Sequence, residues 1–211
     1  MLKIPFFSND KTDLHCMQAC MQMILKYYYP DKKFSIEELN KLLKIGSKKM
    51  YGFPEMAVAV LSDLGINAKY YASSDDREWY KKGKQYLLKK YSKEVAEDIW
   101  KMTDFKTQKP FFKRVLKEKR FVCKKLLFKD LKNFFKKGCL ICPIININIL
   151  ENKKGYAGHA VLIIGIDKKF ITFHDPGLPP EPNNKIKWQD FIRSWKSQGT
   201  ANTVIVVFGK K

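Results

Sequence analysis

Apolar residues recur at helical spacing near the start of the chain. They follow the i, i+3, i+4, i+7 pattern of an amphipathic helix at Cys16, Ala19, Cys20, Met23, Ile24 and Tyr27. Asp13 and Thr12 are both suitable N-cap residues, because their side-chain oxygens accept hydrogen bonds from the free N–H groups of a first turn. Cys16 is therefore expected in the first turn of this helix.

Further helices and a strand are predicted before residue 121. Ser35 and Glu38 have the spacing of a capping box, so a helix is expected over residues 35–43, with Gly46 ending it. The other elements expected in this part are a helix that begins at Pro54 and is stopped by Gly65, a strand over residues 66–71 and a helical insertion over residues 73–120.

Apolar and β-branched runs dominate after residue 120. The expected elements are a strand at 121–128, a helix at 129–136, a strand at 140–149, a hairpin of 159–166 with 170–174, a proline-rich loop to 184, a helix at 189–196 and a strand at 202–208. Helices first and strands later predict an α+β architecture in a single domain, residues 1–211. No apolar run approaches the roughly 20 residues of a transmembrane segment, and no export signal is recognised, so a cytoplasmic location is expected.

The chain is strongly basic. Lys and Arg total 41 against 21 acidic residues, a net charge of +20, which attracts anionic surfaces and nucleic acid weakly and without specificity. Sites that read bases favour arginine, yet there are only four, Arg77, Arg114, Arg120 and Arg193. The aromatic residues of the insertion leave two interpretations open, a stacking surface for single-stranded nucleic acid or, as we favour, a helical hairpin with inward-facing rings.

Five cysteines are an odd number, and without an export signal they do not indicate a disulfide framework. Cys139 and Cys142 have the spacing of half a zinc site, but a matching second pair is missing from the sequence. Their apolar surroundings favour a role as small buried hydrophobic side chains. No metal and no other cofactor is expected.

Three residues far apart in the sequence could form a nucleophilic site. A cysteine at a helix start, such as Cys16, has backbone N–H groups that stabilise a thiolate and can bind an oxyanion. His159 and Asp175 mark the open ends of the predicted hairpin, nine residues before and seven after Lys168, so we expect neighbouring positions. There the carboxylate can hold the imidazole while its other nitrogen takes the cysteine proton.

The two other histidines are predicted to be structural. His15 precedes Cys16, and adjacent helical residues point about 100° apart, so the two side chains do not face one another. His174 precedes Asp175 on a strand and is expected on the opposite face.

Three segments resemble a known family. Cys16-Met-Gln-Ala-Cys20-Met-Gln-Met-Ile resembles the nucleophile helix of the C39-like cysteine peptidases, Gly158-His159-Ala-Val-Leu-Ile-Ile-Gly165 resembles their histidine strand, and His174-Asp175-Pro176 their acidic residue. The resemblance covers most of the chain outside the insertion. It implies a papain-like fold with a helical lobe on an antiparallel sheet lobe, and a thiol-dependent peptidase whose catalytic triad is Cys16, His159 and Asp175. It also implies a peptide or protein substrate, with related acyl transfer as a second chemistry.

Two positions depart from the family's pattern. Met17 stands where the family usually has glycine, directly beside Cys16, and Asp10 stands where it usually has a glutamine that donates to the oxyanion. Asn9 keeps an amide one residue further upstream, so it is the expected oxyanion donor. These departures leave two alternatives open: a weak or inactive peptide-binding module on the same fold, or a protein that binds anionic surfaces or nucleic acid through the insertion.

Overall fold

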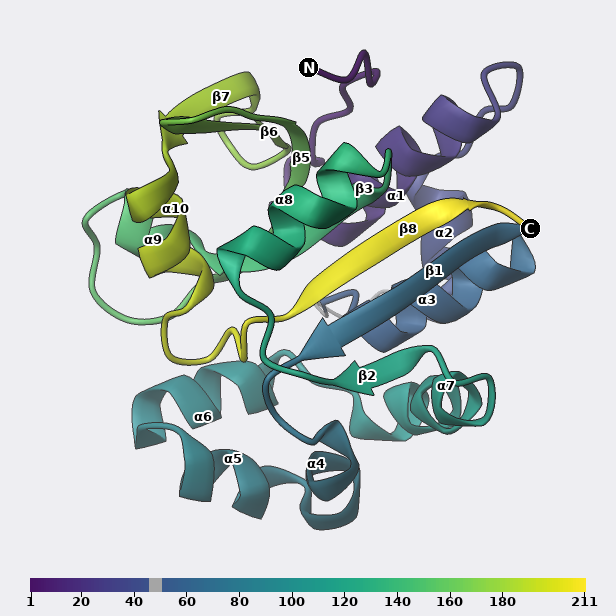
Figure 1. Cartoon of the computed structure of the whole chain (residues 1–211). Coiled ribbons are helices and arrows are strands. Elements are labelled where there is room, and N and C mark those ends of the chain that lie inside the picture. The colour runs from purple at the N-terminus through teal and green to yellow at the C-terminus, as the bar shows by residue number, and fades with distance from the viewer. Residues whose placement is uncertain (46–50) are drawn as a thin grey trace.

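A single mixed sheet forms the centre of the protein (Figure 1). The computed structural model describes residues 1–45 and 51–211, so Gly46, expected to end the second helix, lies outside the described residues. The strands are β1 (Ile66–Ala72), β2 (Phe121–Cys123), β3 (Leu140–Asn146), β4 (Gly158–Ala160), β5 (Leu162–Ile166), β6 (Phe170–Asp175), β7 (Glu181–Lys187) and β8 (Val204–Lys210). Their order is β2-β1-β8-β3-β5-β6-β7, with β4 also paired to β3, and only the β1–β2 pair is parallel.

Helices cover both faces of this sheet. The helices are α1 (Cys16–Tyr28), α2 (Ile36–Leu42), α3 (Pro54–Asp63), α4 (Asp76–Lys82), α5 (Lys84–Lys90), α6 (Lys93–Lys101), α7 (Phe105–Lys117), α8 (Phe128–Lys136), α9 (Ile147–Leu150) and α10 (Trp188–Trp195). α1 and α3 pack on one face, and α8 and α10 pack on the other (Figure 1). Within the described ranges, no helix has the length and apolar character needed to cross a bilayer.

The central strands are buried on both faces, which explains their unbroken apolar runs. Along β3, Leu140 and Cys142 face the core under α1 and α3, whereas Cys139 and Ile141 face the core under α8 and α10. The thiols of Cys139 and Cys142 therefore lie on opposite sides of the sheet and cannot bind one metal ion together. No group of three or more potential metal ligands is found among residues 1–45 and 51–211.

The segment 73–120, expected to be helical, carries α4 to α7 at the edge of the sheet beside β2 (Figure 1). Its aromatic rings pack inward. Trp79 and Tyr80 are buried, and the ring of Tyr80 stacks on that of Phe112 with centroids 3.8 Å apart. These rings belong to the core and do not form an open surface on which nucleic-acid bases could stack.

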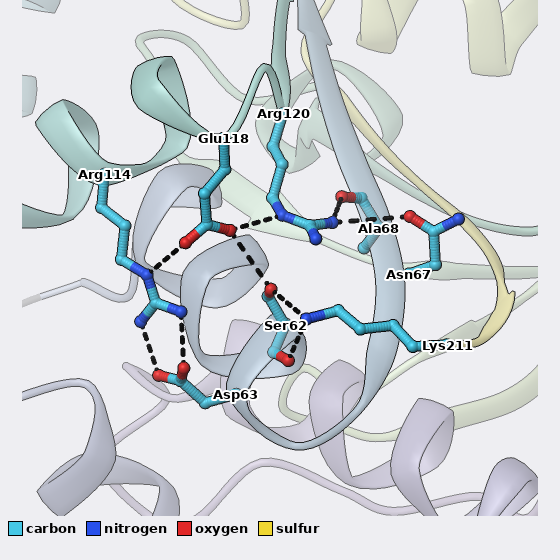
Figure 2. A network of polar contacts seen from close by, with 8 residues as sticks. All are labelled: Ser62, Asp63, Asn67, Ala68, Arg114, Glu118, Arg120 and Lys211. Atoms are coloured by element: carbon cyan, nitrogen blue, oxygen red, sulfur yellow. Dashed lines mark hydrogen bonds and ion pairs between the residues drawn. The ribbon is translucent and has the colours of Figure 1, made fainter.

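Ion pairs join the end of this segment to the rest of the protein (Figure 2). Arg114 at the end of α7 binds Asp63 through two hydrogen bonds of 2.5 and 2.7 Å, and Glu118 accepts from both Arg114 and Arg120 at 2.6 Å. Lys211 donates to Ser62 at the end of α3. The two remaining arginines pair with acids as well, Arg77 with Asp75 and Arg193 with Asp190. All four arginines therefore have intramolecular partners.

Three predicted strands and one predicted loop differ from the structure. The strand expected at 121–128 ends at Cys123, where its partner β1 also ends, and α8 begins at Phe128. The strand expected at 140–149 ends at Asn146 and gives way to α9. The strand expected at 159–166 is divided at Val161 into β4 and β5. The proline-rich stretch holds β7. This strand lies at the edge of the sheet and is largely exposed, so it lacks an apolar pattern and tolerates proline.

Candidate active site

Helix α1 begins at Cys16, in the first turn as the apolar pattern predicts, but its predicted cap is wrong. The N-cap residue is His15, and neither Thr12 nor Asp13 caps the helix. The carbonyl oxygen of the Asn9 side chain accepts the His15 N–H at 2.8 Å instead. The lead segment turns back on itself before the helix, with Asp13 at a φ of 56°, so a residue six positions away supports the helix start.

The sulfur of Cys16 lies against β4. The backbone N–H of Ala160 donates to Cys16 Sγ at 3.4 Å, and Ala160 directly follows His159. Cys16 is 9% exposed. This N–H and the free amides of the first turn of α1 both present positive partial charge at the helix start. The fold thus brings the sulfur to Ala160, 144 positions away in the sequence, on the strand that carries the candidate base.

His159 and Asp175 form a buried hydrogen-bonded pair. His159 Nε2 lies 2.6 Å from Asp175 Oδ1, and both residues are less than 10% exposed. The backbone N–H of Gly177 donates to the same carboxylate oxygen at 2.8 Å and so helps to fix it. With Nε2 engaged by the carboxylate, the other ring nitrogen, Nδ1, is the one free to exchange a proton with a thiol.

Electrostatics favour the protonated form of His159. Burial lowers the pKa of the imidazole, but the charge of Cys16 and hydrogen bonds to Asp175 and Cys16 outweigh it and raise this pKa well above its ordinary value. The imidazolium is therefore stabilised between two groups of opposite charge. Such an arrangement can hold a thiolate and an imidazolium together and pass a proton between them.

The strand pairing that brings His159 and Asp175 together differs from the predicted hairpin register. β4 pairs with β3, with His159 opposite Ile145, while the ladder between β5 and β6 begins at Leu162 opposite His174. The break at Val161 moves His159 off the hairpin. Asp175 lies one position beyond the β5–β6 ladder and is nevertheless within hydrogen-bond distance of His159. The two side chains are therefore close, as expected, although they do not occupy neighbouring positions of one hairpin.

Asn9, the expected oxyanion donor, connects the start of α1 to the loop after Asp175. Its backbone N–H donates to the Pro176 carbonyl at 2.7 Å, and its side-chain nitrogen donates to Asp13 at 2.9 Å. An amide nitrogen carries two hydrogens. In the described part of the chain, the second has no hydrogen-bond acceptor.

The two other histidines make structural contacts. His15 Nδ1 lies 3.0 Å from Asp10, and its Nε2 lies 3.1 Å from the side-chain nitrogen of Asn40. His174 Nε2 lies 3.0 Å from the carbonyl oxygen of Ile4 and so ties the N-terminal segment to β6. Sequence reasoning missed Asn40, which lies on α2 and has no motif that would mark it.

Gly52, which no sequence motif marks, accommodates Met17. A Cβ atom added at Gly52 would lie 3.3 Å from Met17 Cβ and 3.1 Å from Gln18 Oε1. Met17 is itself buried in this contact. The methionine beside Cys16 is therefore packed against a position that lacks a side chain, and a Cβ atom there would crowd it.

A cleft of about 120 Å³ begins at this cluster. Cys16, Met17 and His159 line it, and its other walls come from the start of α3, the helices α4 to α6 and residues 199–203. The candidate sulfur and imidazole are thus open to a ligand that enters the cleft, although both are largely buried.

The sequence matches the model of the Peptidase_C39 like family over residues 1–203. The chain belongs to the C39-like peptidase family. Family membership implies a peptide or protein substrate. No curated protein is similar enough in sequence to count as a match.

Solved structures share the fold of this C39-like protein. One is the peptidase domain of Streptococcus ComA, a bi-functional ABC transporter involved in a quorum sensing pathway, with a TM-score of 0.51, 13% identity and coverage of 98% of each chain. Another, from Bacillus anthracis and assigned to the C39-like peptidases, has a TM-score of 0.51 and 14% identity over 99% of this chain and 96% of the other. The predicted family and the α+β, papain-like fold are confirmed.

Proposed function

We propose that this C39-like protein is a thiol-dependent peptidase that hydrolyses a peptide bond with Cys16 as nucleophile, His159 as base and acid, and Asp175 as the residue that orients His159. The observation that carries the proposal is the buried 2.6 Å hydrogen bond between His159 and Asp175 beside the Cys16 sulfur. A structural histidine needs no carboxylate partner next to a thiol at a helix start.

In the first half of the reaction, Cys16 Sγ attacks the carbonyl carbon of the scissile bond. Its proton resides on His159 Nδ1, which passes it to the leaving amine as the C–N bond breaks. Asp175 balances the positive charge of the imidazolium throughout. The product of this half is a thioester between Cys16 and the acyl part of the substrate.

The oxyanion formed during the attack needs hydrogen-bond donors. The Cys16 backbone N–H has no acceptor within its own helix, as is general for a first turn, and the second amide hydrogen of Asn9 is the other donor that we assign. Asn9 replaces the family's upstream glutamine in this role. Its link to Asp13 and to His15 supports this assignment, because it fixes the amide beside the helix start.

Water completes the reaction. His159, neutral after the amine has left, takes a proton from a water molecule, which attacks the thioester and releases the acid. An amine in place of water would give acyl transfer by the same steps. The protein's own residues supply the nucleophile, the base and the oxyanion donors, so each proton in these steps has a donor and an acceptor.

A catalytically inactive peptide-binding module on the same fold is the second candidate. It is favoured by Met17 and Asp10, which depart from the family's pattern at the nucleophile and at the oxyanion donor. Met17 is buried against Gly52, and both residues line the cleft beside Cys16.

Alkylation by iodoacetamide at neutral pH separates the two candidates. A peptidase requires a reactive thiolate, so Cys16 is expected to label at least about tenfold faster than Cys123. Cys123 is exposed and serves as an internal control within the same chain. Labelling is followed residue by residue by mass spectrometry, and His159→Ala is expected to abolish the difference.

The complementary measurement is hydrolysis of a mixed pool of fluorogenic peptides. Cys16→Ser is expected to remove the activity, and the protein's thermal unfolding midpoint serves to show that the variant is folded. Equal, slow labelling of Cys16 and Cys123 in the wild-type protein contradicts the enzyme and leaves the binding module.

A further inference from the structure

Helices of the 73–120 segment supply one wall of the cleft that contains Cys16. This wall consists of side chains from α4, α5, α6 and the adjoining loops, namely Ser74, Asp76, Trp79, Tyr86, Leu87, Tyr91 and Ile99. Cys16 and His159 line the same cleft. A substrate whose scissile bond reaches the sulfur therefore has this wall next to it.

The wall is mainly apolar and aromatic. Trp79 and Leu87 are buried, and Tyr86, Tyr91 and Ile99 are half-buried, so part of each of these three side chains is open to a ligand. Trp79 is held in place by contacts with the rings of Phe53 and Phe105. Rigid rings of this kind provide large contact areas for an apolar side chain at small cost in conformational entropy.

The two carboxyl groups of the cleft do not make it a strongly acidic pocket. Burial raises the pKa of Glu55 to about 8, although the hydrogen bond from Tyr80 opposes the shift, so this carboxyl is neutral at pH 7. Burial also raises the pKa of Asp76 to about 6, and the positive charge of Lys90 acts on Asp76 in the opposite direction. A cationic side chain in the cleft therefore meets the neutral carboxyl of Glu55 and the carboxyl of Asp76, whose negative charge already interacts with that of Lys90.

We propose that this wall is a specificity pocket, which selects peptide substrates with a bulky apolar side chain near the scissile bond. The inference rests on the proposed peptidase function and adds the class of substrate. It also gives the inserted helices α4 to α6 a role in substrate binding.

The test uses tripeptide chloromethyl ketones, which alkylate a cysteine nucleophile faster when their peptide part binds beside it. In a set of probes, Phe, Ala, Lys or Asp occupies each position in turn, and the second-order rate of labelling at Cys16 is measured for each. At one position the Phe probe is expected to react roughly 10 to 100 times faster than the Ala probe, as burial of an aromatic side chain predicts. The Lys and Asp probes are expected to react more slowly than the Phe probe.

Two variants locate the selectivity in the wall. Ile99→Trp fills the cleft and is expected to lower the ratio of Phe to Ala labelling about tenfold. Leu88→Trp is the matched control, because Leu88 lies on α5 but is 43% exposed and does not line the cleft.

Iodoacetamide separates failure of this inference from failure of the proposed function, because it is too small to need the pocket. Fast iodoacetamide labelling of Cys16 with equal rates for the Phe and Ala probes overturns the pocket and leaves the peptidase standing. A preference for the Lys probe, or a Phe-to-Ala ratio that Ile99→Trp and Leu88→Trp change equally, also overturns it. Slow labelling by every reagent overturns both proposals.

Discussion

Two buried acids beside the same cleft behave differently. Asp175 and Glu55 are 6% and 2% exposed, and each accepts a hydrogen bond from a neighbouring side chain. The partner of Asp175 is His159, a base that can carry the opposite charge. The partner of Glu55 is Tyr80, a neutral hydroxyl, and the pKa of Glu55 rises to about 8.

The comparison shows that burial and the neighbouring groups act against each other, with a different result at each site. Burial lowers the pKa of His159, the partner of Asp175, but the charge of Cys16 and the hydrogen bonds to Asp175 and Cys16 raise it well above its ordinary value. At Glu55 burial outweighs the hydrogen bond from Tyr80, which lowers the pKa, so the neutral acid is favoured. The first arrangement suits proton transfer at a nucleophile, and the second suits an apolar wall.

The largest effect is expected when the charge pair is broken. Asp175→Asn keeps the shape of the side chain and removes its charge, so peptide hydrolysis is expected to fall about 10²- to 10⁴-fold. The pKa of His159, followed by NMR titration of its ring protons, is expected to fall as well. An unchanged His159 titration together with a rate within threefold of the wild type contradicts the assigned role of Asp175.

The next effect concerns the oxyanion. Asn9→Ala is expected to slow hydrolysis about 10²- to 10³-fold, as the loss of one oxyanion donor does in other enzymes. Alkylation by iodoacetamide forms no oxyanion, so the loss in hydrolysis is expected to exceed the loss in alkylation. Equal losses in both measurements indicate instead that Asn9 serves only to hold the start of α1.

The smallest effect concerns stability at the neutral acid. Because the pKa of Glu55 is raised from 4.5 to about 8, the folded state holds this proton more tightly than the unfolded chain does. Its contribution to the free energy of unfolding is therefore lost as the pH rises from about 5 to 8, with a limiting slope of about 1.4 kcal/mol per pH unit.

Glu55→Gln has no such proton to lose, so urea unfolding at pH 5 and pH 8 is expected to show a smaller pH dependence for the variant than for the wild type. Glu37→Gln, at an exposed position on α2, is the matched control and is expected to follow the wild type. Parallel pH profiles for Glu55→Gln and the wild type contradict a neutral Glu55.

Local features of this protein could be predicted from the sequence. The start of α1 at Cys16, the capping box of Ser35 and Glu38, and the turn between β5 and β6 each depend on residues within a few positions of one another. Hydrogen bonds within a turn and the periodicity of apolar side chains decide them. The predicted order of cysteine, histidine and acid along the chain also led to the confirmed family.

Contacts between distant segments were decided only by the tertiary structure. Asn9 accepts the N–H of the N-cap residue His15 because the lead segment folds back, Gly52 makes room for Met17, and the break at Val161 directs His159 toward Asp175 from outside the hairpin. The neutral state of Glu55 likewise depends on its burial, which raises its pKa to about 8. Packing and burial join residues that no local pattern relates, so these features depend on the whole fold.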